Sequence, residues 1–309
     1  MEFSHTASLG GGVIGASWTA LFLASGRSVA VFDPDPEVER RVRDYIEMAW
    51  PTMDALGLTE NGRPEAVRFV ASAAEAVEGA DFVQESVPER LAIKHATYAE
   101  IEPVLRAEAI VASSASGLTL AEMQGGWRDP SRLVLAHPFN PPHLVPLVEL
   151  MGNGATAPDV VPAAERFYEA VGKVTIRLNK GMPGHVSNRL QAALWREAIH
   201  LVVEGVASVA DVDKAVWAGP GLRWAALGPT MQFSTSAGPG GMQAFIDHFQ
   251  DMFNGWWDTM GQVKLDDDVI AQIVAGVDEA AGGRTVAEIA AERDRLVVAI
   301  QRAIREAKS

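Results

Sequence analysis

An imidazole and a carboxylate, His137 and Glu149, flank a proline-rich loop. His137 follows one apolar run, residues 131–136, and Glu149 lies within a second, residues 146–150, with prolines between them. The two runs predict short strands, which could bring the side chains together as a general base and the group that orients it. The same stretch is also compatible with a buried, hydrogen-bonded histidine and an unrelated surface glutamate.

A glycine-rich turn near the N-terminus predicts a dinucleotide site. Residues 5–9 predict a strand, residues 16–25 an apolar helix, and the turn Gly10-Gly11-Gly12-Val13-Ile14-Gly15 lies between them. In this order the glycines permit a tight turn and close backbone approach to a pyrophosphate, and the helix N-terminus offers N–H groups to phosphates. We therefore expect Gly10, Gly12, Val13, Ile14 and Gly15 to bind a cofactor, although residues 5–9 are less apolar than a buried first strand usually is.

Asp33 ends the next predicted strand, residues 27–33, at the distance from Gly15 where a ribose-binding carboxylate is expected. The residues after it are Pro34-Asp35-Pro36 and include no arginine. A 2′-phosphate would meet negative charge there, so the sequence favours NAD over NADP.

Strand and helix signals alternate as far as residue 180. Strands are expected at about 67–70, 81–85, 109–112 and 173–178, with helices between them, and residues 37–57 predict a helix that is kinked or broken at Pro51. After the breaker Gly181-Met182-Pro183-Gly184 the periodicity is helical, with a first helix at about 185–205 and a last at 285–308. We expect an α/β fold, with an N-terminal Rossmann-type doubly wound sheet over residues 1–181 and an all-α C-terminal domain over residues 182–309.

Composition restricts the classes of function. A net charge of −14 over 309 residues disfavours nucleic acid and anionic membrane surfaces as partners. The chain has no cysteine, which excludes thiol nucleophiles and thiolate metal sites. We see no leader and no apolar run long enough to span a membrane, and expect a cytoplasmic protein without a metal site. The apolar stripe of the last helix must be covered by the helical domain itself or by a second copy of the chain.

These motifs, in this order, resemble the 3-hydroxyacyl-CoA dehydrogenase family over essentially the full chain. The resemblance rests on the glycine turn, Glu85-Ser86-Val87-Pro88-Glu89 through Lys94, Ser113–Gly117, His137-Pro138-Phe139-Asn140-Pro141, Glu149 and Asn188-Arg189-Leu190. It implies an NAD-dependent dehydrogenase that forms a homodimer through its helical domain. The roles it implies are catalytic histidine for His137, orienting glutamate for Glu149, hydroxyl-binding serine for Ser116 and carbonyl-polarising asparagine for Asn188. It also places Glu89, Lys94, Ser116 and Asn140 beside the nicotinamide half of the cofactor.

Within the family, the chain is similar to the branch that acts on small free 3-hydroxy acids such as L-carnitine and L-gulonate. The phrases Gln84–Arg90 and Gly221-Leu222-Arg223-Trp224-Ala225 carry this likeness, and residues 51–61 have none of the lysines that thioester-specific relatives carry. Trp195 and Trp224 would hold a trimethylammonium group, although most such tryptophans are core residues. Arg223, or else Arg189 or Arg196, would pair with the substrate carboxylate.

The resemblance therefore implies oxidation of a small-molecule 3-hydroxy acid, with L-carnitine first. L-gulonate and a 3-hydroxyacyl-CoA, such as 3-hydroxybutyryl-CoA, are the alternatives among enzymes. An NAD-binding structural protein of the crystallin kind is the alternative from another class. Loss of His137 or Glu149 would indicate it, and both residues are present.

Overall fold

The computed structural model describes residues 3–308, which form two compact units. The first contains residues up to Val186 together with residues 294–307, and the second contains residues 187–293 with Lys308. The α/β fold followed by a helical part is confirmed. The expected domain boundary at residue 181 stays a prediction, and residues 294–307 of the last helix join the first unit.

The first unit is built on one eight-stranded sheet with the order β3-β2-β1-β4-β5-β6-β7-β8. All neighbouring pairs are parallel except β6 and β7, which are antiparallel. The strands are β1 (His5–Leu9), β2 (Ser28–Phe32), β3 (Val67–Phe69), β4 (Phe82–Glu85), β5 (Ile110–Ser113), β6 (Leu133–Pro138), β7 (Leu147–Met151) and β8 (Val174–Arg177). The chain order reverses between β1 and β4, and ligands of doubly wound sheets bind at such a reversal.

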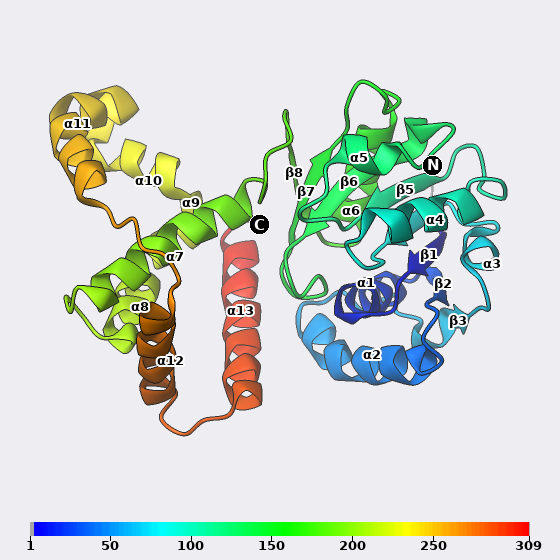
Figure 1. Ribbon diagram of the computed structural model, residues 1–309, viewed down its shortest axis with the longest axis horizontal. Coiled ribbons are helices and arrows are strands. Elements are labelled where there is room, and N and C mark those ends of the chain that lie inside the picture. The colour runs from blue at the N-terminus through cyan, green and yellow to red at the C-terminus, as the bar shows by residue number, and fades with distance from the viewer. Residues whose placement is uncertain (1–2, 309) are drawn as a thin grey trace. The chain divides into compact units, whose positions relative to one another are not determined.

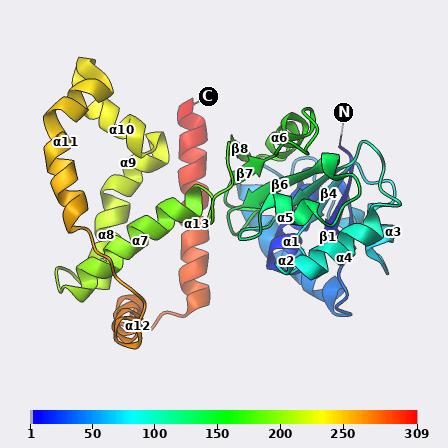
Figure 2. The same ribbon diagram turned by 45° about the horizontal axis from the view of Figure 1, so that its top comes forward.

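Helices cover both faces of this sheet (Figure 1, Figure 2). Buried residues of α1 (Val13–Ala24), α2 (Val38–Ala55) and α6 (Val160–Ala170) pack in one core, and those of α3 (Ala73–Val77), α4 (Leu91–Ile101) and α5 (Leu120–Gln124) pack in the other. Successive strand residues enter alternate cores, as Val134 and Leu135 do. Because both faces of these strands are buried, apolar residues are favoured at successive positions, which explains the continuous apolar runs in the sequence.

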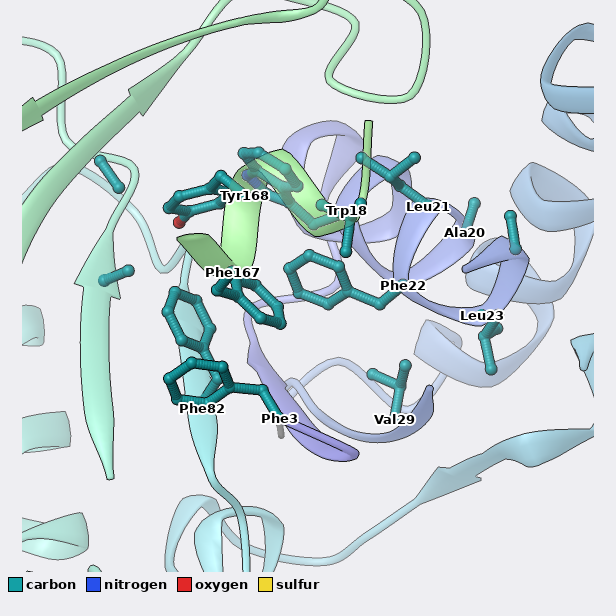
Figure 3. Close-up of a cluster of buried hydrophobic side chains, with 14 of the residues drawn as sticks. Phe3, Trp18, Ala20, Leu21, Phe22, Leu23, Val29, Phe82, Phe167 and Tyr168 are labelled. Atoms are coloured by element: carbon teal, nitrogen blue, oxygen red, sulfur yellow. The ribbon is translucent and has the colours of Figure 1, made fainter. Parts of the chain in front are cut away.

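An aromatic cluster fills the first core, and Figure 3 shows the rings of Phe22, Phe82 and Phe167 turned toward one another. The rings of Phe82 and Phe167 stack with centroids 3.8 Å apart, and Phe22 meets Phe167 edge-on at 5.2 Å. These rings come from α1, β4 and α6, so the cluster packs both helices against β4, a central strand of the sheet.

Two sequence features seemed incompatible with this fold, the polar residues of β1 and the proline in α2, and local contacts explain both. Thr6 and Ser8 of β1 are buried, but their hydroxyls donate to the carbonyls of Ser28 and Gly15, so no polar group is left unpaired. The expectation of a break at Pro51 is wrong, because α2 continues to Ala55 as one helix, and a kink there stays a prediction. Pro51 lies near the C-terminal end, and α2 packs along α1, which stabilises the helix despite the lost N–H donor.

The second unit contains helices and, among its described residues, no strand. It contains α7 (Ser187–Val203), α8 (Val209–Ala218), α9 (Pro220–Leu227), α10 (Pro229–Ser236), α11 (Gly241–Thr259), α12 (Asp267–Ala281) and the first turns of α13 (Val286–Lys308). A capping box precedes α13, since Thr285 and Glu288 exchange side chain-to-backbone hydrogen bonds. Between residues 3 and 308, no helix is both long and apolar enough to cross a membrane.

Candidate active site

The carboxyl ends of four adjacent strands place the predicted site residues at one edge of the sheet. Leu9 of β1 is in register with Glu85 of β4, and Glu85 with Ser113 of β5. Ser113 is in register with Leu135 of β6, so His137 lies two positions beyond that line. The glycine turn, the Ser86–Arg90 loop, the Ser114–Thr119 loop and His137 therefore meet at this edge.

The glycine turn has the shape that a pyrophosphate requires. Gly10 has φ +93°, and a Cβ there would come within 2.5 Å of the Ser86 carbonyl oxygen, while a Cβ on Gly15 would lie 1.8 Å from the Gly10 oxygen. A Cβ on Gly12 would instead meet no atom within 4 Å. Gly12 is the N-cap residue of α1, and no side chain caps the N-terminus of this helix. The first amides of α1 thus face open space, which fits a phosphate-bearing cofactor.

Asp33 is fixed beside this turn. One carboxylate oxygen accepts from the Gly11 N–H at 2.7 Å and the other from the Asp35 N–H at 2.9 Å. Arg41, which no sequence motif indicated, lies beside them: its guanidinium is 3.9 Å from Asp33, bonds Asp35 at 2.6 Å and donates to the Gly11 carbonyl. An arginine is therefore present near the ribose-binding position, but it comes from α2 and is paired with acidic side chains.

His137 and Glu149 form a buried pair. They stand directly opposite each other in the antiparallel ladder of β6 and β7, and His137 Nδ1 lies 2.8 Å from Glu149 Oε2. His137 is 6% exposed and Glu149 is fully buried, with its Oε1 accepting from the Val186 N–H at 3.0 Å. A carboxylate on Nδ1 favours the tautomer whose proton is on Nδ1, which leaves Nε2 free to accept a proton. The alternative of an unrelated surface glutamate is wrong.

Glu89 and Ser116 meet across the site, a contact that the sequence did not predict. Glu89 accepts from the Ser116 hydroxyl at 2.8 Å and from the backbone N–H groups of Ser116, Gly117 and Leu118. Burial works to raise the pKa of Glu89, but these hydrogen bonds outweigh it and lower the pKa. Glu89 therefore remains ionised and orients the Ser116 hydroxyl, which keeps its lone pairs for a ligand.

Lys94 lies behind this loop, in a buried network. Its ammonium donates to Glu85 at 2.6 Å, and the hydroxyls of Tyr98 and Ser113 donate to the other oxygen of Glu85 at 2.7 Å. Lys94 is 1% exposed, so in this arrangement it holds Glu85 and the start of the Ser86–Arg90 loop. Asn140 is exposed in the loop between β6 and β7, where its amide is open to a ligand.

His185 is a site residue that no sequence motif indicated, because it lies directly after the breaker Gly181–Gly184, at the start of the segment 185–205 that was predicted only to be a helix. Its ring lies 5.0 Å from the His137 ring, centroid to centroid, and the residue is 7% exposed. Neither ring nitrogen has a hydrogen-bond partner within residues 3–308. Leaving a buried polar group unpaired costs about 1–3 kcal/mol. Burial, and then the charge of His137, lower the pKa of His185 against smaller opposing effects of Glu149, the Ala115 backbone and Glu89.

The remaining predicted residues belong to the second unit. Asn188 stands in the first turn of α7 and Trp195 further along that helix, with 52% of its surface exposed. Arg223 and Trp224 are neighbours on α9, the former exposed and the latter half-buried. Among the described residues, no cluster of His, Asp and Glu has the arrangement of a metal site.

Comparison with known proteins gives a consistent assignment. Residues 5–181 match the NAD binding domain of 3-hydroxyacyl-CoA dehydrogenase, and residues 184–268 match the C-terminal domain of the same enzyme. The chain is 46% identical to L-carnitine dehydrogenase of Streptomyces coelicolor, over 97% of this chain and 94% of that one. It is 40% identical to L-carnitine dehydrogenase of Pseudomonas aeruginosa, over 100% and 96%.

A solved structure extends the likeness to the whole fold. The crystal structure of 5-formyl-3-hydroxy-2-methylpyridine 4-carboxylic acid 5-dehydrogenase, an NAD+-dependent dismutase, matches with a TM-score of 0.83. The two chains are 28% identical, and the match covers 98% of this chain and 99% of that one.

Proposed function

From the premise that this chain belongs to the 3-hydroxyacyl-CoA dehydrogenase family and is an NAD-dependent dehydrogenase, we propose that it oxidises the 3-hydroxyl of L-carnitine. The observation that carries the chemistry is the buried His137–Glu149 pair at the carboxyl edge of the sheet. The choice of substrate is supported by the likeness to L-carnitine dehydrogenases over nearly the whole chain.

We propose that Gly10, Gly12, Val13, Ile14 and Gly15 hold the cofactor phosphates and that Asp33 binds the adenosine ribose. Glu89, Lys94, Ser116 and Asn140 would form the nicotinamide end, Lys94 through its hold on Glu85. Bound NAD+ supplies the acceptor for the hydride that leaves C3. The side chains of this protein perform the other steps, which are binding the substrate, removing its hydroxyl proton and stabilising the oxygen.

In this proposal, neutral His137 takes the hydroxyl proton at Nε2 as the C3–H bond breaks. Glu149 stabilises the imidazolium and keeps the ring in place through Nδ1. Asn188 would donate to the oxygen as it becomes a carbonyl, and Ser116 would do so by turning its O–H, which Glu89 accepts in this structure, toward that oxygen. Trp195 and Trp224 would hold the trimethylammonium group, and Arg223 remains our candidate for the carboxylate.

A substrate panel tests this function. Purified protein with NAD+ is expected to reduce the cofactor with L-carnitine, and with a higher kcat/KM than with L-gulonate or 3-hydroxybutyryl-CoA. D-Carnitine is the matched control, because it has the same charges and the opposite configuration at C3. A rate on L-gulonate without one on L-carnitine would contradict the substrate, and no cofactor reduction with any 3-hydroxy acid would favour a structural role.

Asp33 should decide between NAD and NADP. We expect Asp33→Ser to raise the ratio of kcat/KM for NADP+ to kcat/KM for NAD+ by about 10- to 100-fold, because a charged hydrogen-bond acceptor is lost and Arg41 is released toward a 2′-phosphate. Initial rates with both cofactors measure this ratio. Asp44→Ser is the control, because it removes the same negative charge from a residue of α2, and it should leave the ratio of the two kcat/KM values unaltered. An unaltered ratio in Asp33→Ser would show that Asp33 does not bind the ribose.

We also propose that the helical unit pairs with a second copy of the chain. Among its described residues, the only buried apolar side chains are those of Ile199 and Val212. Large apolar residues such as Trp217, Leu222 and Trp257 are at least 60% exposed. A surface this apolar in a protein of this charge fits a homodimer interface. Light scattering should give twice the mass of the chain at micromolar concentration, and a single-chain mass would contradict the proposal.

A cytoplasmic location also remains a prediction.

A further inference from the structure

The His185 ring is built into the site in a way that packing alone does not explain. Its backbone has φ 50°, in the left-handed region, which histidine tolerates better than most side chains but which still disfavours it. The ring is buried beside His137, and both of its nitrogens lack partners within the described residues. An apolar side chain would avoid that cost, so the nitrogens point to a ligand.

The charged groups near His185 already have hydrogen-bond partners of their own, so the His185 ring can donate to a ligand. Glu149 accepts from His137 and from the Val186 backbone, directly after His185. Glu89 accepts from the backbone of the Ser116 loop, and the Lys94 ammonium is engaged by Glu85. The carboxylates near His185 are therefore compensated by their own donors and do not exclude an anionic ligand group.

We infer that His185 is a substrate-positioning residue that donates a hydrogen bond to the carboxylate of the 3-hydroxy acid. This inference rests on the proposed function. One methylene separates the hydroxyl-bearing carbon of such an acid from its carboxylate, so the two oxygen groups lie side by side, as the His137 and His185 rings do. His137 would receive the hydroxyl proton while His185 fixes the acid end.

Steady-state kinetics of His185→Phe, with L-carnitine and with L-carnitinamide, test the inference. The amide keeps the hydroxyl and the trimethylammonium group but lacks the negative charge. We expect the KM for L-carnitine to rise about 10- to 100-fold, with kcat changed by less than about threefold, because a bond to a charged group is lost in the ground and transition states alike. The KM for the amide should rise by about threefold at most, because hydrogen bonds to neutral acceptors are weaker.

His185→Asn is the matched variant, because asparagine accepts the left-handed backbone and still carries an N–H donor. It should recover most of the loss seen in His185→Phe, and the Kd for NAD+ should be unchanged in both variants. Equal rises in KM for acid and amide, a weaker NAD+ affinity, or a fall in kcat alone would overturn the inference. Wild-type protein that oxidises no 3-hydroxy acid would overturn the proposed function and this inference with it, whereas an active wild type with unaffected variants overturns the inference alone.

Discussion

Replacing His137 with glutamine should lower kcat by about a hundred- to ten-thousand-fold, the range that a positioned general base contributes. Glutamine can still hydrogen-bond Glu149, but its amide cannot accept the hydroxyl proton. The Kd for NAD+, measured by titration calorimetry, should stay within about twofold, since the proposed contacts to the cofactor phosphates and ribose come from the glycine turn and Asp33 and not from His137.

His143→Gln is the control for this substitution. His143 is also buried, in the loop after β6, and its ring meets Ser17 and Tyr45. We expect His143→Gln to change stability and to retain most of the turnover. If His137→Gln keeps most of the wild-type kcat, His137 is not the base.

Replacing Glu149 with glutamine should lower kcat over the same range, about a hundred- to ten-thousand-fold. The amide would donate to His137 Nδ1, so the imidazole would carry its proton on Nε2 and could not take another as a neutral base. The same tautomer argument accounts for a loss of about ten-thousand-fold when the buried aspartate of serine proteases is replaced by asparagine. The variant keeps an oxygen for the Val186 N–H, so its fold should survive.

The rate of Glu149→Gln should be followed across pH together with that of Glu165→Gln. Glu165 is a carboxylate of α6 that pairs with Arg177 on β8. Its replacement removes the same charge and should leave kcat nearly unaltered. A Glu149→Gln variant with the wild-type pH profile and rate would show that the carboxylate does not set the state of His137.

The doubly wound part of the fold could be predicted because its signals are local. The glycine turn, Asp33 and the apolar runs each depend on a few neighbouring residues, and the strands lie within a few residues of their expected positions. Residues 5–9 seemed too polar, since the sequence does not show that Ser28 and Gly15 would accept from their hydroxyls. Packing of α2 against α1 was likewise needed to know that the helix continues through Pro51.

The site was predictable in its residue types and less so in its contacts. His137 and Glu149 were expected to be neighbours, but the ladder register that places them opposite each other comes from the antiparallel pairing of β6 and β7. The contact of Glu89 with Ser116 joins two loops far apart in sequence. Arg41 reaches Asp33 from the next helix, and His185 reaches His137 through an unusual backbone angle, which no short motif signals.

The most direct measurement of the proposed reaction uses L-carnitine that carries deuterium at C3. The enzyme and NAD+ are mixed with this substrate, and the mass of the reduced cofactor is determined. Removal of the hydroxyl proton by His137 with transfer of the C3 hydrogen as hydride predicts that the reduced cofactor contains the deuterium. Reduced cofactor without the label, or no reduced cofactor, would contradict this account.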